Sequence, residues 1–195
     1  MSKKQNARER LLDISFEEIY VHGYAATSID TILKKAQVPK GSMYHHFKSK
    51  KDLVLVMIQE RLFIKMDEFF KYEKEDSKTV QESFRNIFVG ISKNKMLITY
   101  GCPLYRLMVE LAPVDKDFDF VLTEKAKQMQ EGVELLLQKG IDIGELSDEL
   151  DTKSFSGYIL SGVWGILSLS PSLSSSKNFL SQSKHILNEL ESYKK

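Results

Sequence analysis

The ten residues from Gly41 to Lys50 gather two serine hydroxyls, two imidazoles, a phenol and two ammonium groups within about three helical turns. They include no acidic side chain, so the segment offers the hydrogen-bond donors that suit a polyanion. The residues just before it, from Ser28 to Val38, have the pattern of a short helix followed by a turn. Together the two segments predict a helix-turn-helix directed at DNA.

Charge is divided unevenly along the 195 residues. Residues 1–52 hold ten Lys or Arg and six Asp or Glu, whereas the remainder holds 18 basic and 21 acidic residues, which leaves a net charge of +1. Three of the four histidines also lie in the first 52 residues. This division fits a phosphate-binding head on a body with another task, and chance variation of surface charge is the alternative.

With 42% hydrophobic residues, the chain can form a core large enough to fold without disulfides or a structural metal. Its single cysteine, Cys102, cannot form an internal disulfide, so we expect a reducing, cytoplasmic compartment. The first ten residues are polar and lack the apolar run of a secretory signal. The least polar window, Phe155 to Leu169, is interrupted by serines and glycines, so no membrane span is expected.

Apolar residues recur at helical spacing along most of the chain, and no convincing strand alternation interrupts them. The pattern predicts an all-α fold of about nine helices. Their expected ranges are 6–22, 28–35, 40–46, 50–70, 80–91, 103–112, 118–139, 151–170 and 176–193.

Polar residues and glycines mark the expected helix ends. Thr27 with Asp30, and Ser49 with Asp52, match the capping box at a helix start. Gly140 is expected to cap the seventh helix. The apolar residues expected in the core of the three-helix head are Ile32, Val38, Met43 and Phe47.

The stretch from Gly23 to Leu53 closely resembles the DNA-binding domain of TetR-family (tetracycline-repressor-like) transcriptional regulators. The residues that carry this resemblance are GYAATSI at 23–29, Ile32, and AQVPKGSMYHHFKSKKDL at 36–53. The match covers about residues 5–60; beyond it, the resemblance rests on length, helix count and the sequence GCPL at 101–104. It implies a helix-turn-helix domain over 5–64 and a ligand-binding and dimerisation domain over 65–195.

The resemblance implies that the recognition helix and two neighbouring helix starts contact DNA. The implied DNA-binding residues are Thr27, Ser28, Lys40, Gly41, Ser42, Tyr44, His45, His46, Lys48 and Lys50. Physical chemistry supports these roles, because a helix start presents N–H groups to phosphate and Gly41 would let the helix approach the groove. His46 stays open between a phosphate contact and a packed residue that covers the core.

Two positions depart from the common family pattern. Gln37 stands where a glycine usually lies in the turn, and Pro39 stands where a serine usually caps the recognition helix. A left-handed Gln37 would be strained by about 1 kcal/mol. These departures affect the expected turn geometry and leave the motif intact.

Metal and enzyme alternatives find little support in the sequence. His45 and His46 are adjacent on the expected helix and point about 100° apart, with no Asp, Glu or Cys ligand at a suitable spacing. No Gly-x-Ser-x-Gly elbow or glycine-rich phosphate loop accompanies the serines. We therefore expect no metal, no cofactor and no enzymatic activity.

The body is rich in aromatic and methionine side chains, most of which are expected to be ordinary core. The resemblance implies that some of them enclose a cavity for a largely apolar effector. The candidate ligand-binding residues are Phe63, Met66, Phe70, Phe88, Tyr100, Cys102, Tyr105, Met108, Met129, Tyr158 and Trp164. For Cys102, a buried inert thiol and a redox or electrophile sensor remain alternatives.

Small residues on the eighth expected helix and apolar residues on the ninth suggest a dimer interface, with close packing inside one chain as the alternative. The candidate residues are Gly157, Ser161, Gly165, Phe179, Ile186, Leu187 and Leu190. A two-fold interface would place two recognition helices about 34 Å apart, one turn of DNA.

These observations predict a homodimeric transcriptional regulator, a repressor rather than an activator, that binds a palindromic double-stranded DNA operator and is released by a small-molecule effector. The alternative is a ligand-binding or protein-interaction module whose head has lost DNA binding.

Overall fold

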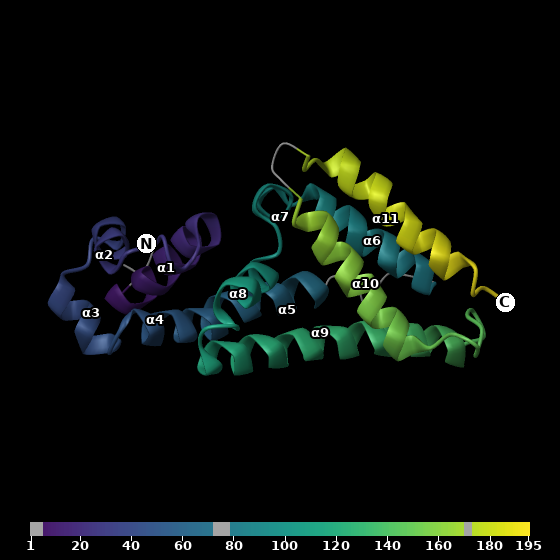
Figure 1. Ribbon diagram of the computed structural model, residues 1–195, viewed down its shortest axis with the longest axis horizontal. Coiled ribbons are helices and arrows are strands. Elements are labelled where there is room, and N and C mark those ends of the chain that lie inside the picture. Colours follow the sequence, from purple (N-terminus) through teal and green to yellow (C-terminus); the bar gives the residue numbers. More distant parts are fainter. Residues whose placement is uncertain (1–5, 72–78, 170–172) are drawn as a thin grey trace, which may run out of the picture. The chain divides into compact units, whose positions relative to one another are not determined.

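The computed structural model describes residues 6–71, 79–169 and 173–195, with the side chains of residues 69–71 left out. The expected all-α class is confirmed, and the described residues contain no strand beyond one isolated bridge between Leu146 and Lys194 (Figure 1). The helices are α1 Ala7–His22, α2 Ile29–Ala36, α3 Lys40–His46, α4 Lys50–Met57, α5 Ile64–Lys71, α6 Val80–Lys93, α7 Lys95–Tyr100, α8 Pro103–Leu111, α9 Lys116–Asp142, α10 Thr152–Leu167 and α11 Ser176–Glu191.

The chain forms two compact units. The first contains the N-terminal residues up to Phe69 together with Arg106–Asp119, and the second contains residues 70–105 and 120–195. The boundary expected between residues 64 and 65 did not foresee that Arg106–Asp119 packs with the N-terminal residues. Helix α8 begins in the second unit and ends in the first.

Polar side chains cap the starts of α1, α2 and α4, whereas α3 begins at Pro39 without a side-chain cap. The carboxamide of Asn6 accepts a 2.9 Å hydrogen bond from the amide of Glu9, and Ser28 and Ser49 accept from Thr31 and Asp52. Ser49 was expected as a cap, but the expected cap Thr27 is wrong, because the cap of α2 is Ser28.

The core of the head forms where α1, α2 and α3 meet. Ile32, Val38, Met43 and Phe47 are at most 4% exposed, which confirms the expected core residues. They pack with α1, whose Leu11 and Leu12 are fully buried. This apolar contact fixes α3 on the head by its buried side.

Helices α4 and α5 run on from each other through a π-helical segment, Ile58–Phe63, in agreement with the single long helix expected here. Ion pairs join this segment to α1. Arg8 pairs with Glu60, and Arg61 pairs with both Glu9 and Asp13. The hydrogen bond from Arg8 lowers the pKa of the Glu60 carboxyl below its usual value.

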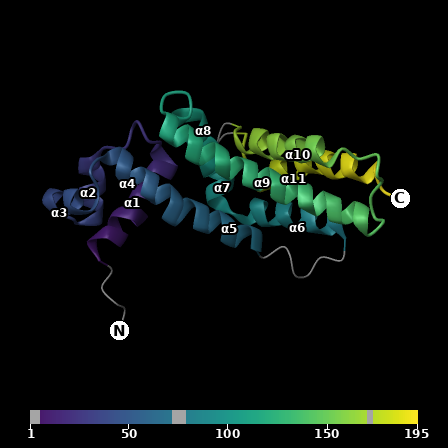
Figure 2. The same ribbon diagram turned by 90° about the horizontal axis from the view of Figure 1, so that it is seen from below.

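The core of the second unit is aromatic and aliphatic. Helix α11 packs along α6 and α10, which lie beside it in both views (Figures 1 and 2). The ring centroid of Phe88 lies 6.3 Å from those of both Phe84 and Phe179. These rings are at most 2% exposed, so they form the buried core of the contact between α6 and α11.

Two expectations about the second unit are wrong. Helix α7 was not foreseen, and Gly140 is not a helix cap but lies inside α9, which ends at Asp142. The turn after α9 uses Gly144, with a φ of +76°. Gly140 is instead needed for space, because a Cβ there would lie 2.7 Å from Leu146 and 2.9 Å from Val80.

Candidate nucleic-acid interface

The turn between α2 and α3 has the geometry that a helix-turn-helix requires. Gln37 adopts the left-handed conformation, with φ 53° and ψ 47°, which is strained for a residue that carries a Cβ. The amide of Val38 donates to the carbonyl of Leu33, and the buried Val38 side chain joins the core. Pro39 then begins α3 in an extended conformation, so replacing the usual serine preserves the helix start.

Helix α3 has one buried side and one exposed side. Met43 is fully buried, whereas Lys40, Gly41, Tyr44, His45 and His46 are exposed and Ser42 is half-buried. The phenol side chain of Tyr44 is 48% exposed although it is a large aromatic. The exposed side therefore presents ammonium, phenol and imidazole donors, which are the groups that bind phosphates and base edges.

The two histidines of α3 lie against each other at the end of this exposed side. Their ring centroids are 5.2 Å apart, at an interplanar angle of 67°. His46 is exposed, and its ring centroid lies 6.2 Å from that of the buried Phe47. This exposure does not fit the packed residue that was one alternative, and the phosphate contact stays a prediction. Lys48, just after α3, is exposed as well.

Thr27, Ser28 and Lys50, the expected phosphate contacts at the starts of α2 and α4, differ in exposure and in hydrogen bonding. Thr27 is 2% exposed and its hydroxyl donates to the carbonyl of Gly23 at 2.8 Å, so it does not fit the expected role. Ser28 is exposed and caps α2.

Lys50 is half-buried, and its ammonium group donates to the carbonyl of Tyr24 and lies 4.0 Å from the Tyr24 ring centroid. Burial lowers the pKa of Lys50, and the Glu110 carboxylate opposes this effect.

The turn between α1 and α2 is held by a residue that the sequence did not reveal. The carboxylate of Glu110, near the end of α8, accepts hydrogen bonds from the amides of Tyr24 and Ala25, at 2.9 and 2.7 Å. Close by, Lys51 pairs with Asp115 and Asp117, both at 2.7 Å. Hydrogen bonding to these two carboxylates raises the pKa of Lys51. Local periodicity carries no signal for contacts between residues so distant in the chain.

Comparison with known families agrees with this geometry. The sequence model described as "Bacterial regulatory proteins, tetR family" matches residues 11–57, which run from α1 to the end of α4 and include the whole helix-turn-helix. The chain belongs to the TetR family.

Relatives of this TetR-family chain match far beyond the head. A Lactococcus lactis protein named as an uncharacterized helix-turn-helix-type transcriptional regulator is 29% identical over 133 residues, 66% of this chain and 67% of that protein. The transcriptional repressor KstR2 of Mycolicibacterium smegmatis is 26% identical over 167 residues, 84% of this chain and 78% of that protein. A crystal structure of a TetR regulator from Chloroflexus aurantiacus, at 24% identity, superposes with a TM-score of 0.87 over 100% of this chain and 98% of that one, which shows a shared fold.

The candidate effector residues of the TetR-family chain are spread over both units. Phe63, Met66 and Met108 belong to the first unit, and the rest belong to the second. Phe88, Cys102 and Met66 are buried and Tyr158 is 46% exposed, while those that are half-buried are Phe63, Tyr100, Tyr105, Met108, Met129 and Trp164. The side chain of Phe70 lies outside the described residues.

Three of these candidates come together at the start of α8. The ring of Tyr105 stacks on that of Trp164, with centroids 5.3 Å apart and an interplanar angle of 23°. Cys102 lies beside them and is 8% exposed, and burial raises the pKa of its thiol. A thiol that resists ionisation is a poor nucleophile, so this position favours the inert alternative.

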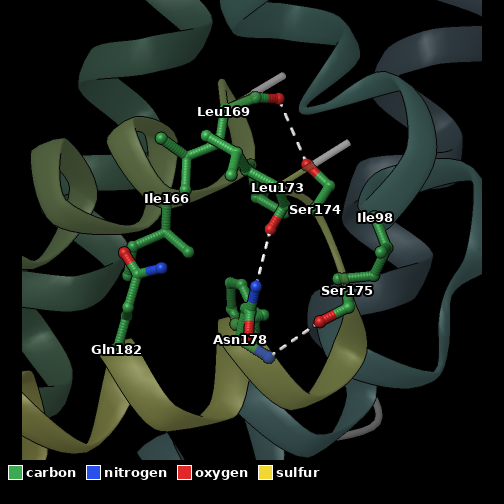
Figure 3. Close-up of a pocket in the computed structure, with 10 residues that line it drawn as sticks. Ile98, Ile166, Leu169, Leu173, Ser174, Ser175, Asn178 and Gln182 are labelled. Carbon is green, nitrogen blue, oxygen red and sulfur yellow. Dashed lines mark hydrogen bonds between the residues drawn. The ribbon is translucent and has the colours of Figure 1, made fainter. Parts of the chain in front are cut away.

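A small pocket with a cavity volume of about 10 Å³ lies in the second unit where α7, α10 and α11 meet (Figure 3). Its lining residues are Ile98, Ile166, Leu167, Leu169, Leu173, Ser174, Ser175, Asn178, Phe179 and Gln182. The side chain of Asn178 donates to the carbonyl of Leu173, and its backbone amide donates to the hydroxyl of Ser175, which caps α11. The volume is below the roughly 300–1,000 Å³ of drug-sized ligand sites, and no expected effector residue lines it.

The candidate dimerisation residues separate into two groups. Ser161 and Gly165 on α10 are exposed, and Gly157 is half-buried. On α11, Phe179, Ile186 and Leu190 are at most 4% exposed and Leu187 is half-buried. The three buried residues pack in the core of their own chain, which differs from the expectation that they face a partner.

In the part of the chain that the structure describes, no helix is long and apolar enough to cross a bilayer.

Proposed function

We propose that this TetR-family chain is a transcriptional repressor that binds a palindromic operator as a homodimer and is released by a small, largely apolar effector. The observation that carries the proposal is the exposed side of α3, which is anchored by Met43 and presents Lys40, Tyr44, His45 and His46 to solvent. Such a surface has donors for phosphate and base edges, and the carboxylate of Asp30 on α2 lies 3.9 Å from the Lys40 ammonium group.

The sign of regulation is supported by a relative. The Mycolicibacterium smegmatis protein that shares 26% identity over most of the chain is named a transcriptional repressor. A repressor needs no surface for contacting polymerase, because occupation of the operator is enough. Release then follows when an effector prefers a conformation that does not bind DNA, and its differential affinity sets the response.

Dimerisation is supported by the exposed small residues of α10. A Cβ added at Gly165 would meet nothing within 4 Å, and Ser161 is exposed one helical turn earlier. Two copies of this face can approach closely about a two-fold axis. Two α3 helices would then fit successive major grooves about 34 Å apart, which requires a palindromic operator.

The experiment that tests the proposal is selection of genomic DNA fragments by the purified full chain, followed by sequencing. We expect a palindrome with half-sites about one helical turn apart. Affinity for that sequence should fall about linearly on a logarithmic salt scale, because Lys40 and Lys48 displace counterions from phosphates. Recovery of no enriched sequence would instead favour the interaction module that has lost DNA binding.

A further inference from the structure

The turn between α1 and α2 is shaped around a carboxylate from a distant helix. Gly23 has a φ of +86°, and the next two amides, of Tyr24 and Ala25, both donate to Glu110. A Cβ at Gly23 would lie 3.2 Å from the Glu110 carboxylate, so a side chain there would crowd it. Two adjacent amides that converge on one anion form a specific cradle rather than a chance surface contact.

The same turn is held from its other side by the start of α4. Lys50 donates to the carbonyl of Tyr24, so the peptide groups on both sides of Tyr24 are engaged. The ring of Tyr24 packs edge-on against that of Phe118, with centroids 5.5 Å apart. Lys51 is bound to Asp115 and Asp117 nearby. The turn is therefore fixed by α4 and by the segment from Glu110 to Phe118.

This turn controls where the helix-turn-helix begins. Its last residue, Thr27, is buried and bonded to Gly23, and the following residue, Ser28, caps α2. A shift of the turn would move the start of α2 and, through the buried Val38 and Met43, the placement of α3. The position of the recognition helix thus depends on what holds Tyr24 and Ala25.

We propose that Glu110 is a positioning residue for operator binding, which acts by holding the α1–α2 turn and does not itself touch DNA. The inference rests on the proposed function, and it names α8 as the helix that sets the DNA-binding form of the head. The opposite end of α8 carries Tyr105, which stacks on Trp164 in the second unit.

Charge gives this proposal a sharp test. A carboxylate on a DNA-binding unit repels phosphates, so its removal should strengthen binding if it acts by charge alone. A positioning role has the opposite sign, because Glu110→Gln keeps the size of the side chain but replaces one accepting oxygen with a donor that opposes an amide. Operator binding should then weaken although the chain has lost a negative charge.

The experiment is a fluorescence-anisotropy titration of the operator found by genomic selection with full-length wild type, Glu110→Gln and Glu17→Gln. Glu17 is an exposed carboxylate on α1 of the same unit and is the matched charge control. We expect Glu110→Gln to bind about tenfold more weakly, as for loss of a charge-assisted hydrogen bond, and Glu17→Gln to bind as tightly as wild type or tighter. Thermal melts followed by circular dichroism give the temperature range in which each variant is folded, and the titrations are done within that range.

Amide exchange at the turn and a second Glu110 variant distinguish a positioning role from a purely structural one. Amide exchange at Tyr24 and Ala25 should become faster in Glu110→Gln and stay unchanged in Glu17→Gln. If Glu110→Gln does not fold, Glu110→Asp keeps the charge with a shorter reach and should also weaken binding. Equal or tighter binding by the folded Glu110 variants would overturn the inference. If wild type itself selects no operator, it is the proposed function that fails.

Discussion

The head of the first unit and the core of the second unit are stabilised by different kinds of contact. In the first unit, ion pairs from Arg8 and Arg61 join α1 to the π-helical segment, and polar side chains cap α1, α2 and α4. In the second unit, the rings of Phe84, Phe88 and Phe179 interlock. The difference shows that the first unit uses charged and polar side chains at its surface, of the kind that bind a polyanion, whereas the second unit relies on apolar packing.

This comparison predicts that substitutions on the exposed side of α3 change binding with little effect on stability, whereas substitutions in the core of the second unit do the reverse. Four stability measurements test this prediction.

The largest expected effect is that of Phe84→Ala. Phe84 is 1% exposed and packs against Phe88, so its truncation leaves a cavity and should lower the free energy of unfolding by about 3–5 kcal/mol. Urea denaturation measures this change. Phe120→Ala is the control, because Phe120 is 69% exposed and should shift stability by less than about 0.5 kcal/mol. Similar small losses for both variants would contradict the account of the core.

Two glycines of α9 should respond to alanine with opposite signs. Gly140→Ala places a Cβ 2.7 Å from Leu146 and should cost about 1–3 kcal/mol. Gly132→Ala meets nothing within 4 Å and should stabilise by about 0.5–1 kcal/mol, because alanine favours the helix. Thermal melts of the pair measure both effects. A stabilising Gly140→Ala would show that Leu146 and Val80 do not confine this helix.

A smaller gain is expected at the turn of the helix-turn-helix. Gln37 has a φ of 53°, a conformation that glycine adopts without strain. Gln37→Gly should therefore raise the free energy of unfolding by up to about 1 kcal/mol, less the entropy that glycine adds to the unfolded chain. A melting temperature at or below that of wild type would indicate that the turn is not strained.

The smallest effect concerns the pH dependence of the ion pairs in the head. Arg8 lowers the pKa of Glu60 in the folded state, so the stabilisation is present above the ordinary glutamate pKa and is lost as pH falls through the lowered value. Arg8→Gln should cost less than about 1 kcal/mol at pH 7, because the pair is partly exposed.

The measurement is the difference in melting temperature between wild type and Arg8→Gln across pH 3–7. The difference should shrink below about pH 4, where glutamates protonate. A difference that is constant over this range would mean that the Glu60 charge does not contribute. Lys34→Gln, on an exposed residue of the same head, is the control and should show no such trend.

The sequence predicted the head well because its signals are local. The buried positions Ile32, Val38, Met43 and Phe47 follow from spacing within one motif, and the structure confirms them. The cap of α2 was misplaced by one residue because Thr27 and Ser28 are both hydroxyl residues in adjacent positions. The Thr27 hydroxyl instead donates to the carbonyl of Gly23, and Ser28 accepts from the amide of Thr31.

Outside the head, the sequence predicted helices but not their contacts. Gly140 was expected to cap a helix, yet it serves close packing against Leu146 in the turn that follows α9 and against Val80 at the start of α6. Glu110 gave no signal, since its two amide partners are 86 and 85 positions away. Periodicity identifies which side of a helix is apolar and does not identify which distant residue meets it.

The measurement that tests the central claim most directly is an anisotropy titration of the selected operator with wild type, Tyr44→Ala and Phe120→Ala. Both aromatic side chains are largely exposed, one on α3 and one on α9. We expect Tyr44→Ala to lose about 1–3 kcal/mol of binding free energy with an unchanged melting temperature, and Phe120→Ala to bind as wild type does. Equal affinities for all three proteins would contradict the assignment of α3 as the surface that binds DNA.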